Sequence, residues 1–209
     1  MSFKAMADVP TDVCGTFYAS RVLGVSVAKV QSLVERGELE AWRTKGGHRR
    51  ISMASVKAYL AQHGSRSSKG LLDAQTPYLK VLVVDDDAVT LAVLRGAIES
   101  WGLPIDATFM SSAMEAMMDI TSLRPDVLVS DLRMPGINGF ELLRAIRANP
   151  LFAGTLLLVI TALSADEISA GGGLPSHTQV LHKPLSLEWV HGFMAAMVRA
   201  KELIAERSA

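Results

Sequence analysis

Five short apolar runs recur through the second half of this chain, and each lies next to a stretch whose apolar residues repeat with helical spacing. Apolar runs without polar alternation are typical of strands that are buried on both faces. Such strands, alternating with helices, favour a doubly wound parallel sheet of the α/β class. We therefore expect strands at residues 81–84, 104–109, 127–129, 156–160 and 179–181, and helices at residues 88–101, 112–123, 139–148 and 186–206.

The connection between the fourth and fifth runs differs from the others because it contains three consecutive glycines, Gly171 to Gly173. A glycine in a helix interior costs about 1 kcal/mol relative to alanine. We therefore expect the helix of this connection to be short or mobile.

The formal net charge is zero, but the charges are divided unevenly along the chain. Residues 1–69 carry 11 of the 21 Lys and Arg and 5 of the 21 Asp and Glu, which gives a net charge of +6. Residues 70–209 carry the other 10 basic and 16 acidic residues, which gives a net charge of −6. Opposite charges suggest two domains with different partners, and the basic one suits a polyanion. We divide the chain into a tail (1–14), a small domain (15–62), a Gly/Ser-rich linker (63–78) and a larger domain (79–209).

The sequence also carries signals about the compartment. Cys14 is the only cysteine, and no apolar run approaches the roughly 20 residues that a membrane helix needs. The N-terminal stretch MSFKAMADVP lacks the apolar core of an export signal. We therefore expect a cytoplasmic protein without disulfides.

Polar side chains stand at the ends of the predicted strands. They are, in chain order, Asp85, Asp86, Asp131, Thr161 and Lys183. In an open parallel sheet the functional crevice lies beyond the carboxyl ends of the strands, so we expect these groups to converge. Three carboxylates close together need a compensating cation, and ligands that are all oxygen favour Mg²⁺. Asp87 has a simpler interpretation, because carboxylates are favoured at the start of a helix.

The motifs VLVVDDD, DVLVSDLRMPGING, VITA and LHKPL occur in this order, and together they resemble the receiver domain of bacterial response regulators over roughly residues 79–200. The resemblance implies a flavodoxin-like fold in which Asp131 accepts a phosphoryl group from a histidine kinase or a phosphotransfer protein. It also implies that Mg²⁺ is held by Asp85, Asp86 and Asp131, with help from the backbone carbonyl of Arg133.

The resemblance assigns the groups around the phosphoryl site as well. Lys183 would pair with the aspartyl phosphate, Thr161 would move toward it, and the Lys183-Pro184 bond would be cis. The family often places an aromatic residue three positions before this lysine, where this chain has Val180. A switch that depends on rotation of that ring cannot operate with valine, so we expect ordering of the Gly-rich connection to replace it.

The protein would then be a regulatory phosphoacceptor and not an enzyme with an external substrate. Leu163 is apolar where relatives can place a group that orients the hydrolytic water, and Arg133 is bulky. We therefore expect slow autodephosphorylation.

The first half of the chain has the pattern of a helix-turn-helix. A short helix ends near Leu23, a tight turn follows at Gly24, and Ser26 can cap a second helix that runs to Arg36. The outer face of this second helix carries polar residues where a recognition helix would pair with base edges: Lys29, Gln31 and Ser32.

A basic hairpin follows the second helix. Two extended segments, residues 39–44 and 49–52, are joined by a Gly-Gly turn, and Ser52 can cap a third helix. The basic residues around the turn could contact DNA phosphates or enter the minor groove. They are Arg43, Lys45, His48, Arg49 and Arg50. The stretch VERGELEAWRTKGGHRRI resembles the winged helix-turn-helix of excisionases and mercury-resistance-type regulators.

These predictions combine into a DNA-binding response regulator in which phosphorylation of Asp131 modulates DNA binding and transcription. One helix reads few base pairs, so we expect a homodimer on paired half-sites. The last helix could form the dimer or pack only on its own sheet, because it has a broad apolar face of Trp189, Val190, Phe193, Met194, Met197 and Val198. The other hypothesis is a phosphorelay or scaffold protein whose N-terminal domain docks a protein.

Overall fold

The computed structural model describes residues 12–44, 47–63 and 78–208. The chain divides into two compact units, Met1–Thr76 and Pro77–Ala209. Most of the predicted linker, residues 64–77, and most of the predicted tail, residues 1–11, lie outside the described residues. Among the helices that the structure describes, none combines the length and the hydropathy needed to cross a membrane.

The C-terminal unit is built on a five-stranded parallel sheet, as predicted. Its strands run in the order β5-β4-β6-β7-β8. Their bounds are Leu79–Val84 for β4, Ile105–Met110 for β5, Val127–Ser130 for β6, Leu156–Thr161 for β7 and Thr178–His182 for β8. The helices between and after them are α5 (Ala88–Ser100), α6 (Ala113–Leu123), α7 (Gly139–Ala148), the short η1 (Pro150–Phe152), α8 (Ala165–Ala170) and α9 (Leu187–Ser208).

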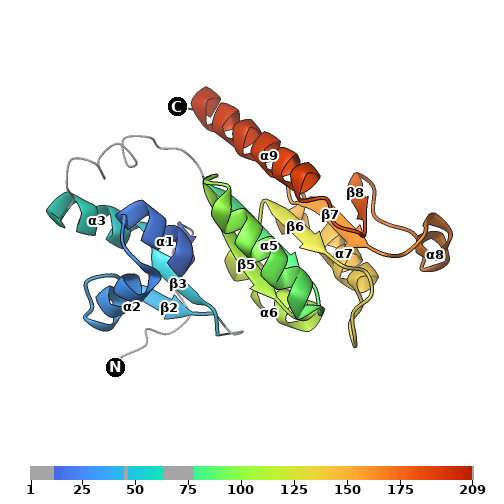
Figure 1. The fold of residues 1–209 in the computed structure, drawn as a ribbon, viewed down its shortest axis with the longest axis horizontal. Helices are drawn as coiled ribbons and strands as arrows, with labels where there is room; N and C mark the ends of the chain where they lie inside the picture. The colour runs from blue at the N-terminus through green and yellow to red at the C-terminus, as the bar shows by residue number, and fades with distance from the viewer. Residues whose placement is uncertain (1–11, 45–46, 64–77, 209) are drawn as a thin grey trace. The chain divides into compact units, whose positions relative to one another are not determined.

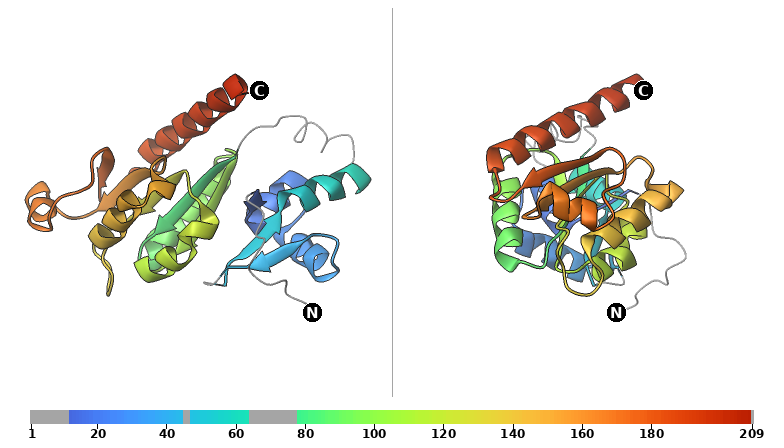
Figure 2. Two further views of the ribbon diagram at one scale, coloured as in Figure 1. Left: turned by 180° about the vertical axis from the view of Figure 1, so that it is seen from behind. Right: turned by 90° about the vertical axis from the view of Figure 1, so that its right-hand side faces the viewer.

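Helices cover both faces of this sheet. Figure 1 and Figure 2 show α5 and α9 on one face and α6 and α7 on the other. Alternate residues of β4 enter the two cores, because Val81 and Val83 pack with α5 and α9 while Leu82 and Val84 pack with α6 and α7. This double burial is the physical reason for the continuous apolar runs in the sequence.

The helix α9 buries one stripe of its apolar face against the sheet. Val190, Met194 and Val198 are buried in the core that α9 shares with α5. Trp189 stays 40% exposed and stacks on Phe193, with ring centroids 5.5 Å apart. Packing on the sheet therefore accounts for that buried stripe, whereas Trp189 remains on the surface.

The Gly-rich connection holds a helix of six residues, α8, and none of its side chains is buried. The helix ends at Gly171, and the backbone then turns through positive φ angles of 92° at Gly172 and 70° at Gly173. The predicted short helix is therefore present.

The N-terminal unit combines three helices with a small antiparallel sheet of order β1-β3-β2. Its elements are β1 (Val13–Cys14), α1 (Thr16–Leu23), α2 (Val27–Glu35), β2 (Ala41–Arg43), β3 (Arg49–Ser52) and α3 (Met53–His63). Ser26 caps α2 by accepting the amide of Lys29, and Gly24 forms the turn with a φ of 66°. Ser52 accepts the amide of Ser55 at the start of α3, as predicted.

The structure corrects the boundary of the tail. Val13 and Cys14 are not tail residues, because they pair with Ser52 and Ile51 of β3 and are buried. A two-residue strand has too little pattern to be recognised in a sequence, and its pairing partner lies almost 40 residues away.

Candidate functional site

A cluster of carboxylates lies where β4 and β6 end side by side. Val84 is in register with Ser130, so the residues that follow the two strands are neighbours. Oxygen atoms of Asp85, Asp86 and Asp131 lie within 4.8 Å of one another. Asp85 and Asp131 are buried, whereas Asp86 is exposed to solvent. The parallel register therefore brings together the three carboxylates predicted from the sequence.

Lys183 reaches into this cluster from the end of β8. Its ammonium Nζ lies 2.7 Å from Asp131 Oδ2 and 3.1 Å from Asp85 Oδ2. Its backbone amide donates to the carbonyl of Thr161 at 2.9 Å, which ties the ends of β7 and β8 together. The Lys183-Pro184 bond is cis, as the resemblance implied.

The electrostatics of the cluster follow from burial and close contact. Burial raises the pKa of the Asp85 carboxyl, although hydrogen bonds from the Asp87 amide and from Lys183 act in the opposite direction. Burial lowers the pKa of the Lys183 ammonium, but hydrogen bonds to Asp131 and Asp85 outweigh it, and the net pKa is raised. Lys183 is therefore held as a cation between two carboxylates.

The donor set of this cluster fits a divalent cation. Three carboxylates and one ammonium leave two negative charges without a partner inside the cluster. All available ligands are oxygens, and the exposed Asp86 leaves room for a hydrated ion, which is how Mg²⁺ is usually bound. The amide of Arg133 donates to Asp131 Oδ1 at 3.2 Å, so the backbone after Asp131 folds back onto the carboxylate.

Thr161 and Asp87 flank the cluster in different roles. Thr161 is fully buried at the end of β7, and its Oγ1 accepts the amide of Leu163 at 3.3 Å. Asp87 is the N-cap of α5 and accepts the amides of Val89 and Thr90. The interpretation of Asp87 as a helix cap is therefore confirmed.

A glycine that sequence reasoning missed sets the shape of the loop after Asp131. The amide of Gly139 donates to the carbonyl of Leu132 at 3.1 Å. A Cβ atom at Gly139 would lie only 2.0 Å from the carbonyl oxygen of Asp131. Only glycine lets α7 begin this close to the carboxylate loop. The motif INGF carries the signal, because glycine often marks a close backbone approach.

The connection at α8 contacts the same loop. The guanidinium of Arg133 forms an ion pair with Glu167 of α8 at 3.0 Å. Glu167 also closes a capping box with Ser164 at the start of α8. The ion pair thus links a side chain next to the cluster to α8, none of whose residues is buried.

The basic hairpin is formed by β2 and β3. Arg43 stands directly opposite Arg49, and Trp42 stands opposite Arg50. Like charges directly opposite each other in a sheet are destabilising. Arg49 Nη1 is covered and has no hydrogen-bond acceptor in the described part of the chain. A negative charge at this end of the hairpin would therefore offset the repulsion between Arg43 and Arg49.

The residues of the hairpin that are predicted to contact DNA differ in their burial. Arg50 is buried, with 5% of its surface exposed, so the expectation of a phosphate contact at this residue is not supported. Its Nη1 donates to the carbonyl of Arg49 at 3.3 Å. Because alternate residues of a strand point to opposite faces, Arg50 and Arg49 lie on different faces of the sheet. Lys45 lies outside the described residues, and His48 is half-buried.

The outer face of α2 presents the predicted polar residues. Lys29 and Gln31 are exposed, and Ser32 is half-buried. Ser32 Oγ accepts a hydrogen bond from the guanidinium of Arg36 at 2.5 Å. Lys29 and Gln31 are therefore accessible to solvent, whereas the Ser32 hydroxyl already has a partner.

Comparisons with known proteins match both units. The response regulator receiver domain family matches residues 81–192, and a helix-turn-helix domain family matches residues 16–64. The chain is similar to the response regulator MprA of Mycobacterium ulcerans, with 30% identity over 131 residues, which cover 63% of this chain and 55% of that protein. It is also similar to the DNA-binding response regulator MtrA of Mycolicibacterium paratuberculosis, with 32% identity over 97 residues, 46% of this chain and 40% of that protein. The chain thus spans about half the length of these relatives.

Solved structures are similar to the C-terminal unit. The receiver domain of the Francisella response regulator 1452 has 28% identity and a TM-score of 0.50, and the match covers 58% of this chain and 98% of that domain. The signal receiver domain of a DNA-binding response regulator from Colwellia psychrerythraea has 23% identity and a TM-score of 0.51, with coverage of 58% and 98%. At 23% identity, the similarity to the second structure concerns the fold alone.

Proposed function

Because this chain belongs to the response regulator receiver domain family, we propose that Asp131 is its phosphoacceptor in a two-component system and that phosphorylation controls DNA binding by the helix-turn-helix unit. The observation that carries this proposal is the position of the Lys183 ammonium, which bridges Asp131 and Asp85 at the carboxylate cluster. A half-buried cation held beside a carboxylate can stabilise the charge of a phosphoryl group that is bound there.

The proposed step is a transfer between two nucleophiles. A carboxylate oxygen of Asp131 attacks the phosphorus of a phosphohistidine, the P–N bond breaks as the new P–O bond forms, and the imidazole takes up a proton. The Lys183 ammonium then moves from the carboxylate of Asp131 to the phosphoryl oxygens. The Thr161 hydroxyl moves toward the same oxygens from the end of β7. Mg²⁺ held by Asp85, Asp86 and Asp131, with the carbonyl of Arg133, would neutralise charge on the same oxygens.

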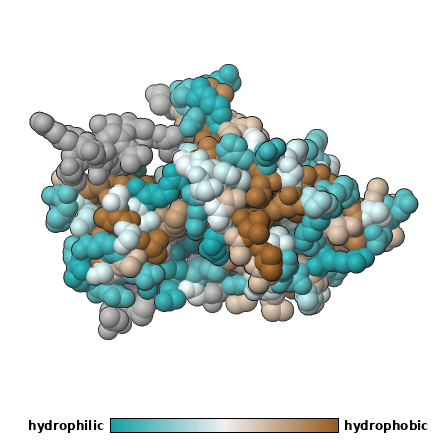
Figure 3. Space-filling model, viewed as in Figure 1, coloured by the Kyte–Doolittle hydropathy of each residue, from teal (hydrophilic) through white to brown (hydrophobic). Residues whose placement is uncertain are grey.

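The phosphodonor requires a surface next to the cluster. Val89 and Val93 of α5 are 69% and 43% exposed, and Val89 follows the cap residue Asp87 closely. Figure 3 shows hydrophobic surface on the side of the C-terminal unit where α5 lies. Exposed apolar patches commonly mark protein contacts. We assign this patch to the docking of the histidine kinase or phosphotransfer protein.

We expect slow loss of the phosphoryl group because of two side chains, Arg133 and Leu163, that follow Asp131 and Thr161 by two positions in the sequence. Leu163 is buried, with 6% of its surface exposed, and it offers no hydrogen bond to a hydrolytic water. Arg133 is engaged with Glu167. Neither side chain orients a water for attack, so the phosphorylated form should persist.

DNA binding is assigned to α2 and the hairpin. Lys29 and Gln31 would face base edges, while Arg43 and Arg49 would contact phosphates and relieve their mutual repulsion. A single module of this size reads few base pairs, so two copies on paired half-sites would be needed. The homodimer belongs to the same proposal.

The test is selection from a random duplex pool by the full-length protein at two salt concentrations, with Mg²⁺ and with or without beryllofluoride as a phosphoryl mimic. We expect a shared motif whose affinity falls steeply with salt and changes with beryllofluoride. Arg49→Ala should abolish the enrichment, and Asp131→Asn should abolish only the response to beryllofluoride. Lys57→Ala removes one exposed charge from α3 of the same unit and should leave the selection unchanged. Absence of a motif in both states would favour an N-terminal unit that docks a protein.

A further inference from the structure

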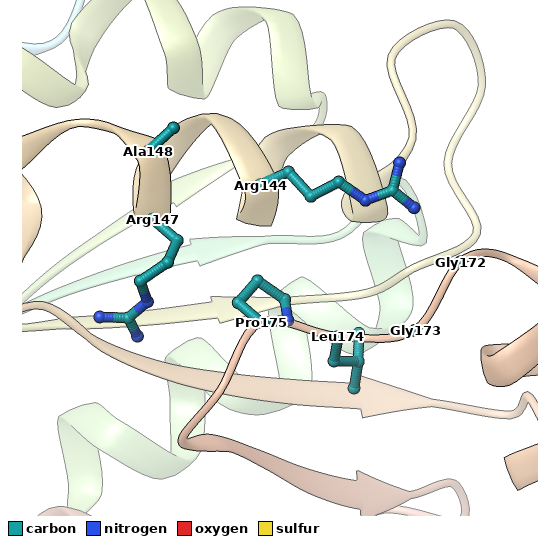
Figure 4. A pocket seen from close by; sticks show the side chains of 7 residues that line it. All are labelled: Arg144, Arg147, Ala148, Gly172, Gly173, Leu174 and Pro175. Carbon is teal, nitrogen blue, oxygen red and sulfur yellow. The ribbon is translucent and has the colours of Figure 1, made fainter.

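A groove lies between α7 and the connection from α8 to β8, and it shares no residue with the carboxylate cluster. Its volume is about 360 Å³, and its lining consists of Arg144, Arg147, Ala148, Gly172, Gly173, Leu174 and Pro175. Figure 4 shows the two guanidinium groups pointing toward opposite ends of the groove, with Leu174 and Pro175 between them. The groove therefore has a cation at each end and a largely apolar middle.

Neither of these two arginines is paired with a carboxylate in the described part of the chain. Arg144 donates to the carbonyl of Gly171 at 2.5 Å, and Arg147 donates from Nη1 to the carbonyl of Ala153 at 3.3 Å. The Nε atom of Arg147 is covered and finds no acceptor among the described residues. Like charges at this spacing on a helix also repel. An anionic group beside the two guanidinium groups would offset this repulsion.

The glycines keep the groove open. Gly172 has a φ of 92°, and a Cβ atom there would lie 2.8 Å from Nη2 of Arg144. Gly173 has a φ of 70°. Side chains other than glycine would be strained on this path, and at residue 172 a side chain would press on the guanidinium. The sequence that shortens α8 thus also leaves Arg144 room beside the groove.

We propose that this groove binds a small anion that carries an acid group, phosphoryl or carboxyl, at each end of a short apolar spacer. A volume of about 360 Å³ lies at the lower end of the roughly 300–1,000 Å³ that small-molecule sites occupy, so a metabolite-sized ligand fits better than a macromolecular segment. Guanidinium groups bind both acid types through paired hydrogen bonds. The lining of this groove contains none of the carboxylates of the cluster, and the proposal does not rest on phosphorylation at Asp131.

The test uses amide spectra of the full-length protein in the absence of Mg²⁺. Trimethylene diphosphonate and glutarate, which carry their two acid groups on the same spacer, are titrated at matched ionic strength, with propylphosphonate as the single-ended probe. We expect saturable shifts at the Gly172, Gly173 and Leu174 amides with one two-ended probe or both, and the tighter of the two identifies the preferred acid group. Propylphosphonate should bind at least several-fold more weakly.

Variants separate this site from general attraction of anions. Arg144→Gln combined with Arg147→Gln should weaken binding by at least about tenfold, because charge-assisted hydrogen bonds are lost. Arg199→Gln combined with Arg207→Gln removes the same charge from α9 and should leave the affinity unchanged. Shifts that do not saturate, that appear only in the basic hairpin, or that weaken equally in both double variants would overturn the proposal. Equal affinity for the single-ended probe would overturn the two-ended ligand.

Discussion

Lys183 and a bound metal ion would compete for the same carboxylates. Removal of the Lys183 charge should therefore change the affinity of the cluster for the ion. The ammonium contacts Asp85 and Asp131, which are also candidate ligands. Replacement by methionine keeps most of the length of the side chain and removes its charge. We expect Lys183→Met to bind Mg²⁺ about tenfold more tightly, because a neighbouring cation no longer competes for the carboxylates.

The measurement for this variant is the rise in melting temperature with Mg²⁺ concentration. Lys201→Met is the matched control. Lys201 forms an ion pair with Asp126, which accepts the amide of Lys80 at the other end of β4 from the cluster. An unchanged or weaker Mg²⁺ affinity in Lys183→Met would contradict the proposed position of the ion.

Gly139 tests how closely α7 must approach the Asp131 loop. A Cβ atom there meets the carbonyl oxygen of Asp131, so Gly139→Ala should destabilise the protein by roughly 1–3 kcal/mol and slow phosphorylation. Gly96→Ala in α5 has open space around the new methyl group and should be stabilising by about 1 kcal/mol. Denaturant unfolding compares the two. Similar effects from both substitutions would show that the close approach is not required.

Asp87 makes a pH-dependent contribution to stability. The hydrogen bond from the Thr90 hydroxyl, with those from the Val89 and Thr90 amides, lowers the pKa of its carboxyl below the ordinary value of 3.8. A lowered pKa in the folded state means that the contribution is fully present above 3.8 and is lost as the pH falls through the folded-state value. The stability difference between the wild type and Asp87→Asn, measured without Mg²⁺, should therefore shrink on acidification below that pH. A difference that does not vary with pH would refute this account.

Among the elements, α9 illustrates how a sequence pattern can leave two alternatives. The apolar residues of α9 form a face broad enough for both a sheet and a partner, and the pattern alone could not divide it. Val190, Met194 and Val198 are buried on the sheet, while Leu203 and Ile204 near the end of α9 stay 41% and 66% exposed. Which residues of this face pack on the sheet depends on where the sheet ends, and the tertiary structure determines that.

Met194 is fully buried, so Met194→Ala should lower the free energy of unfolding by roughly 2–5 kcal/mol. Ile204→Ala removes a similar volume from an exposed position and should change it by about 0.5 kcal/mol or less. Urea unfolding of both variants makes the comparison. A large loss of stability in Ile204→Ala would show that the end of α9 is covered, as expected for a helix that also forms a dimer.

At the scale of the whole molecule, the sequence predicted the parallel sheet and the convergence of its strand-end residues, because the chemistry of each strand end is local and parallel register then aligns the ends. It did not predict features that depend on contacts distant in sequence. Unlike the close approach at Gly139, whose signal in the motif INGF is local, the burial of Arg50 and the pairing of β1 with β3 belong to this second class. Asp126 does too, since it joins the backbone of Lys80 to the side chain of Lys201.

The central claim is that Asp131 accepts a phosphoryl group. Its most direct measurement is the intact mass of the full-length protein after incubation with a small-molecule phosphodonor and Mg²⁺. We predict a gain of one phosphoryl group that is lost in Asp131→Asn and retained in Asp87→Asn, where the helix cap and not the phosphoacceptor is changed. A phosphoryl group that persists in Asp131→Asn, or that never forms on the wild type, would contradict the account.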